Sequence, residues 1–206
     1  NKIKVILLNG KTDLECFNNN DGKNYIGDLI INWNLKSLNN KQFEDYNFKS
    51  ISIPDSVTKI GNDTFEKCSK LTSVTISPNS SMTSIGIDAF RDCAMLNSIT
   101  IPHSIKSIES HAFSGCEQLE SINISPLMQS INASVFNGCI KLKSVTFPLE
   151  VNTKIGGKFS IDDQAFGNCS KLVNINIPKG ADFIANNAFK NCNQLTTITF
   201  LTHNIL

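Results

Sequence analysis

Residues 52–76 read SIPDSVTKIGNDTFEKCSKLTSVTI, and the framework of this segment recurs along most of the chain. Phenylalanine stands three residues before cysteine in six copies, and successive cysteines are separated by 25, 23, 23, 30 and 23 positions. The six pairs are Phe65/Cys68, Phe90/Cys93, Phe113/Cys116, Phe136/Cys139, Phe166/Cys169 and Phe189/Cys192. A repeat of this length is typical of a solenoid, in which each repeat forms one coil.

An alternating segment follows each Phe/Cys pair. Leu stands three residues beyond the Cys, and two apolar residues then alternate with small polar ones, as in Leu71, Val74 and Ile76. This period of two predicts a short strand with one buried face. All six prolines fall just after such a strand, where their missing N–H interrupts no ladder of hydrogen bonds.

The segment from Phe to Cys is predicted to form one helical or 3₁₀ turn, because residues three apart share a helix face. Another apolar anchor lies five residues before each Phe, as Ile60 does before Phe65. Each coil therefore contains a strand, a turn, a second short extended piece and a helical turn. We predict the α/β class: a solenoid with a parallel β-strand ladder and short helical or 3₁₀ turns.

Two parts of the chain are distinguished by this pattern. Residues 1–35 do not repeat, and Asn9-Gly10 after the apolar run IKVILL predicts a β-hairpin. We interpret this segment as an N-terminal cap whose apolar face is formed by Val5, Leu7, Trp33 and Leu35. Residues 36–206 are predicted to form about seven coils. The first is degenerate, with Leu38, Phe43, Tyr46, Phe48, Ile51 and Ile53 in the framework positions.

The coils at 52–76 and 100–124 (TIPHSIKSIESHAFSGCEQLESINI) resemble the BspA-like class of leucine-rich repeats. The pattern of that class runs I-P-x-S-V-x-x-I-x-x-x-A-F-x-x-C-x-x-L-x-S-I-x-I, and the resemblance covers about residues 48–201. Thr64 and Val135 replace the usual Ala, and Leu149 to Ser160 contains an insertion of about seven residues. The resemblance implies a curved leucine-rich-repeat solenoid. In bacteria and parasitic protists, proteins of this class are often surface-associated adhesion or interaction modules.

Composition excludes several functions. The 206 residues carry 19 basic and 18 acidic side chains, a net charge of +1. Such a chain projects no strong positive field, so neither nucleic acid nor an anionic membrane surface is an expected partner. No apolar run approaches the roughly 20 residues of a membrane span, which argues against direct membrane insertion.

The cysteines and histidines do not form a recognisable reactive site. The repeat cysteines lie more than twenty residues apart, whereas zinc ligands are usually two to four apart. Stacked coils would hold these side chains parallel and about 4.8 Å apart, which disfavours disulfides and predicts a column of buried, reduced thiols. Cys16 is the one candidate for a reactive thiol. His103, His111 and His203 have no ligand or nucleophile at a suitable spacing, so we predict no catalytic residue, cofactor or metal.

The outward residues of the strands are the candidate binding face. They are small, polar and uncharged, which suits hydrogen bonding to a ligand. The alternative is that they only satisfy one another across the strands, and the absence of Tyr, Trp and Arg favours this alternative. The candidate residues are Ser73, Thr75, Ser98, Thr100, Ser121, Asn123, Ser144, Thr146, Asn174 and Asn176.

The insertion is a candidate contact loop, with Val151, Ile155 and Phe159 as its apolar residues. The alternative is that the insertion is merely tolerated at the surface.

These features predict a non-enzymatic scaffold for protein interaction or adhesion. The partner is expected to be a protein, with host, cytoskeletal and signalling proteins as options. The alternative is a structural unit that forms homo-oligomers through its terminal coils. TITFLTHNIL contains no polar capping coil, so the chain was either cut from a longer array or associates through that end. The resemblance suggests the cell surface, whereas reduced cysteines and the lack of a signal segment are compatible with the cytoplasm.

Five Asn residues lie in Asn-X-Ser/Thr sequons, which accept N-linked glycans in secreted proteins. They are Asn62, Asn79, Asn123, Asn132 and Asn168. Asn123 is predicted in mid-strand and Asn168 beside a buried Cys, both poor places for a bulky sugar. These positions favour a cytosolic or unglycosylated protein.

Overall fold

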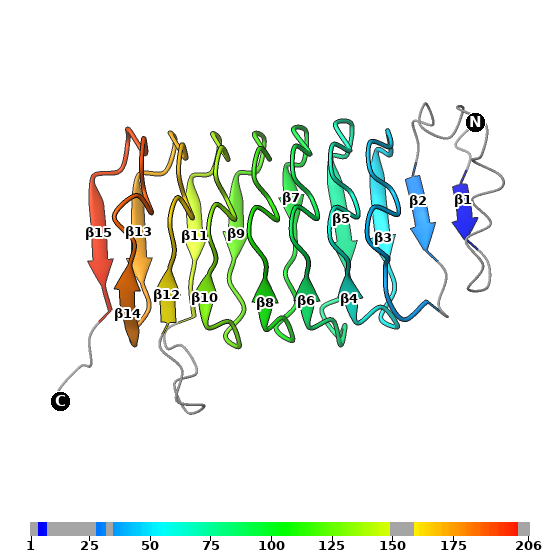
Figure 1. The fold of residues 1–206 in the computed structure, drawn as a ribbon, viewed down its shortest axis with the longest axis horizontal. Coiled ribbons are helices and arrows are strands. Elements are labelled where there is room, and N and C mark those ends of the chain that lie inside the picture. Colours follow the sequence, from blue (N-terminus) through cyan, green and yellow to red (C-terminus); the bar gives the residue numbers. More distant parts are fainter. Residues whose placement is uncertain (1–3, 8–27, 32–34, 149–158, 202–206) are drawn as a thin grey trace.

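The fold is a β-solenoid, seen in a computed structural model that describes residues 4–7, 28–31, 35–148 and 159–201 (Figure 1). Each coil descends along one strand, turns at a proline segment, ascends along a second strand and returns through the Phe/Cys segment (Figure 1). Equivalent strands of successive coils lie side by side and form two parallel ladders.

The first ladder contains the odd-numbered strands together with β2. Its strands are β1 (Lys4–Leu7), β2 (Asp28–Ile31), β3 (Ser50–Ile53), β5 (Ser73–Ile76), β7 (Ser98–Ile99), β9 (Ser121–Asn123), β11 (Ser144–Thr146), β13 (Asn174–Ile177) and β15 (Thr197–Phe200). Hydrogen-bonded pairing runs from β1 to β7, from β9 to β11 and from β13 to β15. Equivalent repeat positions face each other, such as Ser50 and Ser73, so the coils stack in register.

The second ladder contains the shorter strands that lead into each Phe/Cys segment. Its strands are β4 (Lys59–Ile60), β6 (Ser84–Ile85), β8 (Ser107–Ile108), β10 (Ser130–Ile131), β12 (Phe159–Ile161) and β14 (Ala181–Ile184). Pairing runs from β4 to β8 and from β10 to β14. The predicted anchors, such as Ile60 and Ile85, are the buried residues of these strands.

A stack of seven phenylalanine rings runs through the core from Phe43 to Phe189. Adjacent ring centroids lie 5.2–5.7 Å apart and adjacent ring planes differ by only 4–17°. The rings from Phe65 to Phe166 are completely buried. Offset stacking of this kind adds to the free energy of burial, so the rings both exclude water and fix the spacing of the coils.

The prediction of a helical or 3₁₀ turn from Phe to Cys is wrong, and with it the α/β class. Within the described residues every regular element is a strand. The residues two before and two after each inner Phe have a positive φ, as Asp63 (52°) and Lys67 (59°) do around Phe65. A left-handed residue ends a right-handed helix, so the segment consists of successive turns closed by bonds such as that from the Cys68 N–H to the Phe65 carbonyl (3.2 Å).

The turns also pair with the next coil, which explains this backbone conformation. The N–H groups of Asp63, Phe65 and Lys67 donate to the carbonyls of Ile87, Ala89 and Arg91 at 2.7–2.8 Å. The N–H groups of Glu66 and Cys68 donate within the turn instead, to the carbonyls of Asp63 and Phe65. A helix would direct all of these groups along its own axis and would leave no bonds for the neighbouring coil.

The N-terminal strands extend the first ladder. β1 pairs with β2 in parallel, and β2 pairs with β3. The turn and second strand of the predicted hairpin, including Asn9 and Gly10, lie outside the described residues, as does Trp33 of the expected apolar face. Leu35 packs against the core, and Leu38, Phe43 and Phe48 of the degenerate coil are buried in it.

Replacing Phe113 with Ala should destabilise the folded chain by about 3–5 kcal/mol, because the change removes a ring that stacks on both neighbours. Phe183 provides the matched control, since its side chain is 57% exposed. Phe183→Ala should change stability by less than about 0.5 kcal/mol. Urea unfolding of both variants measures the difference, and equal losses would contradict the role assigned to the stack.

Candidate functional surface

The outward residues of the first ladder form one polar face, because side chains alternate between the core and solvent along each strand. Val74 and Ile76 of β5 are buried, whereas Thr75 between them is exposed. The same alternation holds in β9, where Ile122 is buried and Ser121 and Asn123 are exposed. The predicted burial pattern of the strands is therefore correct at these positions.

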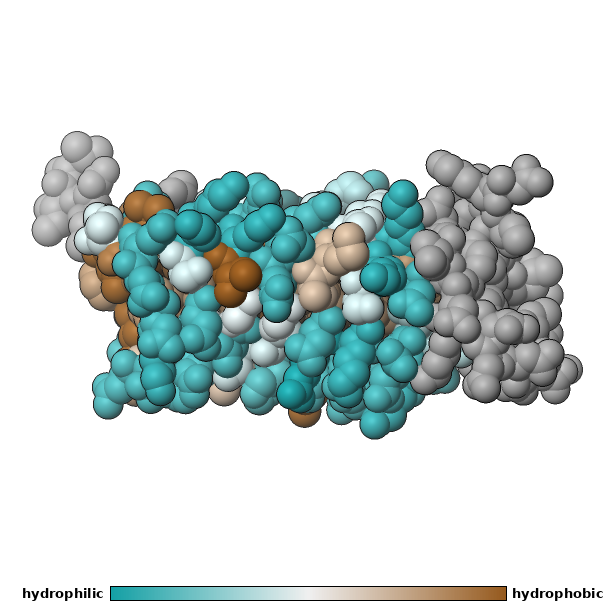
Figure 2. Space-filling view, turned by 90° about the horizontal axis from the view of Figure 1, so that it is seen from above, coloured by the Kyte–Doolittle hydropathy of each residue, from teal (hydrophilic) through white to brown (hydrophobic). Residues whose placement is uncertain are grey.

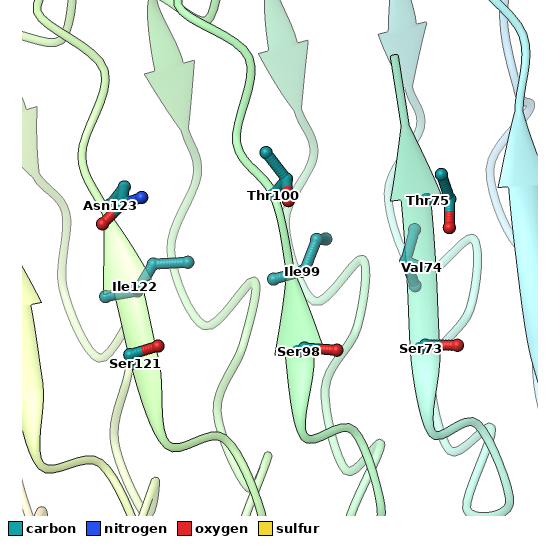
Figure 3. A pocket seen from close by; sticks show the side chains of 9 residues that line it. All are labelled: Ser73, Val74, Thr75, Ser98, Ile99, Thr100, Ser121, Ile122 and Asn123. Atoms are coloured by element: carbon teal, nitrogen blue, oxygen red, sulfur yellow. The ribbon is translucent and has the colours of Figure 1, made fainter. Parts of the chain in front are cut away.

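Part of this face is hollowed. A depression of about 300 Å³ extends across β5, β7 and β9 (Figure 3). Its lining consists of three residues from each coil: Ser73, Val74, Thr75, Ser98, Ile99, Thr100, Ser121, Ile122 and Asn123. Six of the ten candidate face residues are in this set, so the structure brings them together in one hollow.

The hollow crosses an interruption in the first ladder. β5 pairs with β7, but β7 is not hydrogen bonded to β9 as a neighbouring strand. The second ladder is interrupted at the same junction, because β8 pairs with β6 but is not hydrogen bonded to β10 as a neighbouring strand. The two coils are held together here by hydrogen bonds between their turns, such as that from the Phe113 N–H to the Val135 carbonyl (2.9 Å), and by the ring stack, while the outward face carries the hollow.

The chemistry of the hollow is limited to hydrogen bonding and van der Waals contact. Its side chains offer hydroxyl groups and one amide, which both donate and accept. None of the nine lining residues is ionisable. The arrangement contains no acid or base to activate a serine hydroxyl, so its lining suits recognition of a polar ligand.

The remaining candidate face residues lie further along the same ladder. Ser144 and Thr146 are exposed on β11, and Asn174 and Asn176 are exposed on β13. They face the same side as the hollow but do not line it.

The contact-loop prediction is wrong for Phe159. This residue lies in β12, is 1% exposed and packs edge-on against Phe147 with ring centroids 5.9 Å apart. Phe159 is the first residue of β12, and its ring is part of the core. Val151 and Ile155 lie outside the described residues.

The repeat cysteines have a structural role that the sequence pattern did not reveal. Each thiol donates to the carbonyl of the Phe in the preceding coil, for example Cys93 Sγ to Phe65 O at 3.1 Å. The other five bonds are 3.0–3.3 Å long. The six cysteines are free and buried, in agreement with the predicted column of reduced thiols. The constant F-x-x-C spacing was the available signal, because it places a small donor opposite a carbonyl in every coil.

Burial raises the pKa of the Cys93, Cys116 and Cys139 thiols well above the ordinary value. The interaction between the neighbouring Cys169 and Cys192 side chains raises the pKa of Cys169 and lowers that of Cys192. The inner thiols therefore stay protonated near neutral pH, and protonated thiols are poor nucleophiles.

Sequence reasoning also missed a second hollow, of about 570 Å³, on the second ladder. Its lining includes Lys59, Glu109 and two glycines. Gly61 is the sequence feature that could have indicated this hollow, because a Cβ at this position would lie 2.6 Å from Asn40 Oδ1. Asn40 Oδ1 accepts the Asn62 N–H at 2.9 Å, so this amide already joins two coils and we do not assign the hollow to a ligand.

The described part of the chain contains neither a metal-binding cluster nor a membrane-spanning helix. No cluster of three His, Cys, Asp or Glu residues there is arranged to hold a metal ion. No helix with the length and hydropathy of a membrane span occurs in the same residues.

Comparisons with other proteins agree with this architecture. The family model described as BspA type leucine-rich repeat region matches in six copies, over residues 36–159 and 154–205. A leucine-rich cell surface protein from Faecalibacterium prausnitzii has a similar structure, with 31% identity and a TM-score of 0.74 over 85% of this chain. This chain spans 48% of that protein, about half of its length. A leucine-rich repeat protein from T. pallidum is 25% identical, with a TM-score of 0.72, over 82% of this chain and 78% of its own length. No curated protein is similar enough to count as a match.

A thiol reagent applied to the folded chain at neutral pH should label Cys192 first among the six repeat cysteines, because Cys192 lies in the last coil and its pKa is lowered. Cys93, Cys116 and Cys139 should react only after unfolding. Peptide mapping by mass spectrometry measures the order of labelling. Rapid labelling of Cys116 in the folded chain would refute the protonated, buried column. Cys16 lies outside the described residues, so its predicted reactivity remains to be measured in the same experiment.

Proposed function

We propose that this chain, which belongs to the BspA-type leucine-rich repeat family, is a non-enzymatic scaffold that binds a protein through the outward face of its first ladder. Leucine-rich repeat proteins are in general protein-interaction scaffolds. The observation that carries the proposal is the hollow across β5, β7 and β9, which lies within an uncharged polar face.

The geometry of the face favours an extended protein segment as ligand. Strands about 4.8 Å apart hold hydroxyl and amide groups on a rigid frame, and a ligand backbone offers donors and acceptors to match them. Short side chains such as Ser98 and Thr100 lose little conformational entropy when they are ordered. The absence of charge means that association would depend on shape and short contacts, without long-range steering.

Adhesion is the biological setting that we infer for this binding. The similar Faecalibacterium prausnitzii protein is described as a cell surface protein. A solenoid exposed on a cell presents its polar ladder to proteins of other cells. We also propose that residues 1–35 form a cap and residues 36–206 form the solenoid. In support, β1 and β2 continue the first ladder beyond β3.

Self-assembly is the second candidate function, and the last coil favours it. Phe200 and Ile198 in β15 are 58% and 40% exposed, whereas the paired Ile177 and Ile175 in β13 are buried. Figure 2 shows hydrophobic residues gathered at the end of the molecule that carries this strand. An apolar parallel edge of this kind can add another strand.

The sheet-face proposal predicts that three arginines placed in the hollow will abolish capture of the partner. Ser73, Thr100 and Asn123 are the positions to replace, because they contribute one lining residue from each of the three coils. Each arginine adds bulk and charge to a face that has neither. Affinity capture from cell extract, quantified by mass spectrometry, compares this variant with the unmodified chain.

The matched control carries three arginines at exposed positions outside the hollow, namely Asn79, Ser81 and His103. It should capture the same partner as the unmodified chain. If the hollow variant captures that partner equally well, the first ladder is not the binding face.

The self-assembly proposal predicts that the average mass of the chain will increase with concentration, and that Phe200→Lys will keep it monomeric. The lysine places a charge on the exposed apolar edge, and the position is already accessible. Light scattering over a concentration series measures both variants. A strict monomer at all concentrations would eliminate this candidate.

A further inference from the structure

We propose that Asn79 is an N-glycosylation site, the one sequon of the five whose acceptor amide and hydroxyl are both exposed in the folded chain. The sequon is Asn79-Ser80-Ser81, in which Ser81 supplies the hydroxyl that defines the motif. Asn79 and Ser81 are exposed, while Ser80 between them is buried. The group that Asn79 would accept is an oligosaccharide, and its donor is a lipid diphosphate. This inference is independent of the proposed binding face.

The sequon lies in the turn between β5 and β6. The N–H of Ser80 donates to the carbonyl of Ser77 at 3.0 Å, which closes a β-turn with Pro78 and Asn79 at its centre. The hydroxyl of Ser80 accepts the N–H of Met82 at 3.1 Å and so anchors the segment to the core. Within the described residues the side chain of Asn79 makes no hydrogen bond, so its amide nitrogen is available.

The length of this turn explains its exposure. Nine positions separate Ile76 from Ile85, whereas seven separate Ile53 from Ile60 and seven separate Ile101 from Ile108. All these isoleucines are buried framework residues, so the extra residues must extend outward from the stack. The neighbouring turns are shorter and leave the Asn79 turn uncovered.

Two of the other sequons use their amide nitrogen to join coils. Asn132 Nδ2 donates to the Ile108 carbonyl at 3.0 Å, and Asn168 Nδ2 donates to Asn137 Oδ1 at 2.7 Å. A glycan on either nitrogen would disrupt a contact between neighbouring coils. These two side chains are therefore structural amides.

The remaining two sequons have a buried hydroxyl. Thr64, in the sequon of Asn62, is completely buried and donates to the Asn39 carbonyl at 2.9 Å. Ser125, in the sequon of Asn123, is 2% exposed and donates to the Ile105 carbonyl at 2.6 Å. A transferase that must contact this hydroxyl can reach it only if the coil opens.

The reaction transfers one glycosyl group. The Asn79 Nδ2 forms a bond to C1 of the first sugar, and the bond between C1 and the oxygen of the lipid diphosphate breaks. The lipid diphosphate leaves, and the amide nitrogen loses one proton. No residue of the hollow across β5, β7 and β9 belongs to the Asn79 turn, so the glycan would lie outside that lining.

The test presents the folded chain to a purified oligosaccharyltransferase that accepts Asn-X-Ser/Thr, with a lipid-linked oligosaccharide as donor. Synthetic peptides spanning each of the five sequons measure their acceptor strength without the fold. Mass spectrometry then gives the occupancy of each Asn. We expect Asn79 to be modified in the folded chain, and the other four to be modified at least about tenfold less than in their peptides, because their coils must first open.

Two exposed substitutions provide the controls. Asn79→Gln and Ser81→Ala should each abolish modification at this site, whereas Ser81→Thr should preserve it. All three should leave the thermal unfolding midpoint unchanged, because the replaced side chains are exposed. An unmodified Asn79 in the folded chain would overturn the proposal, and so would occupancy of Asn62, Asn123, Asn132 or Asn168 equal to that of Asn79.

Discussion

The stack of phenylalanine rings from Phe43 to Phe189 is the interaction on which the rest of the structure depends. Seven rings with centroids 5.2–5.7 Å apart stack from coil to coil and so hold successive coils in register. Each inner ring also brings its own carbonyl to the next cysteine thiol, as Phe65 does for Cys93. One residue per coil therefore fixes a core contact and a backbone contact together, and a change in spacing would weaken both.

This regularity explains why the surface is where functional differences must lie. The framework positions are filled by apolar residues in nearly every coil, and their side chains are buried. The outward positions of the first ladder are free to vary, yet across β5, β7 and β9 they remain Ser, Thr or Asn. The hollow across β5, β7 and β9 distinguishes one part of this face from the rest. We infer that recognition uses this hollow.

The solenoid and its parallel strands were predictable because the repeat period, the alternating strands and the proline positions all reflect local packing rules. The hydroxyl face was predictable for the same reason, since Thr75 and Asn123 alternate with buried residues. The position of the hollow was not, because it depends on how residues of three coils lie relative to one another. Phe159 was misassigned because the insertion hides where its strand begins, and only contact with Phe147 reveals that it belongs to the core.

The sequence by itself determined the number of framework residues per coil, the buried side of each strand and the column of cysteines. Only the tertiary structure decided that the Phe/Cys segment is a series of turns, and that the amide of Asn132 is occupied while that of Asn79 is free. The physical reason is the range of the contacts. Bonds such as those from Cys68 to Phe43 and from Cys169 to Phe136 join residues 25 and 33 positions apart, so they form only when the coils stack.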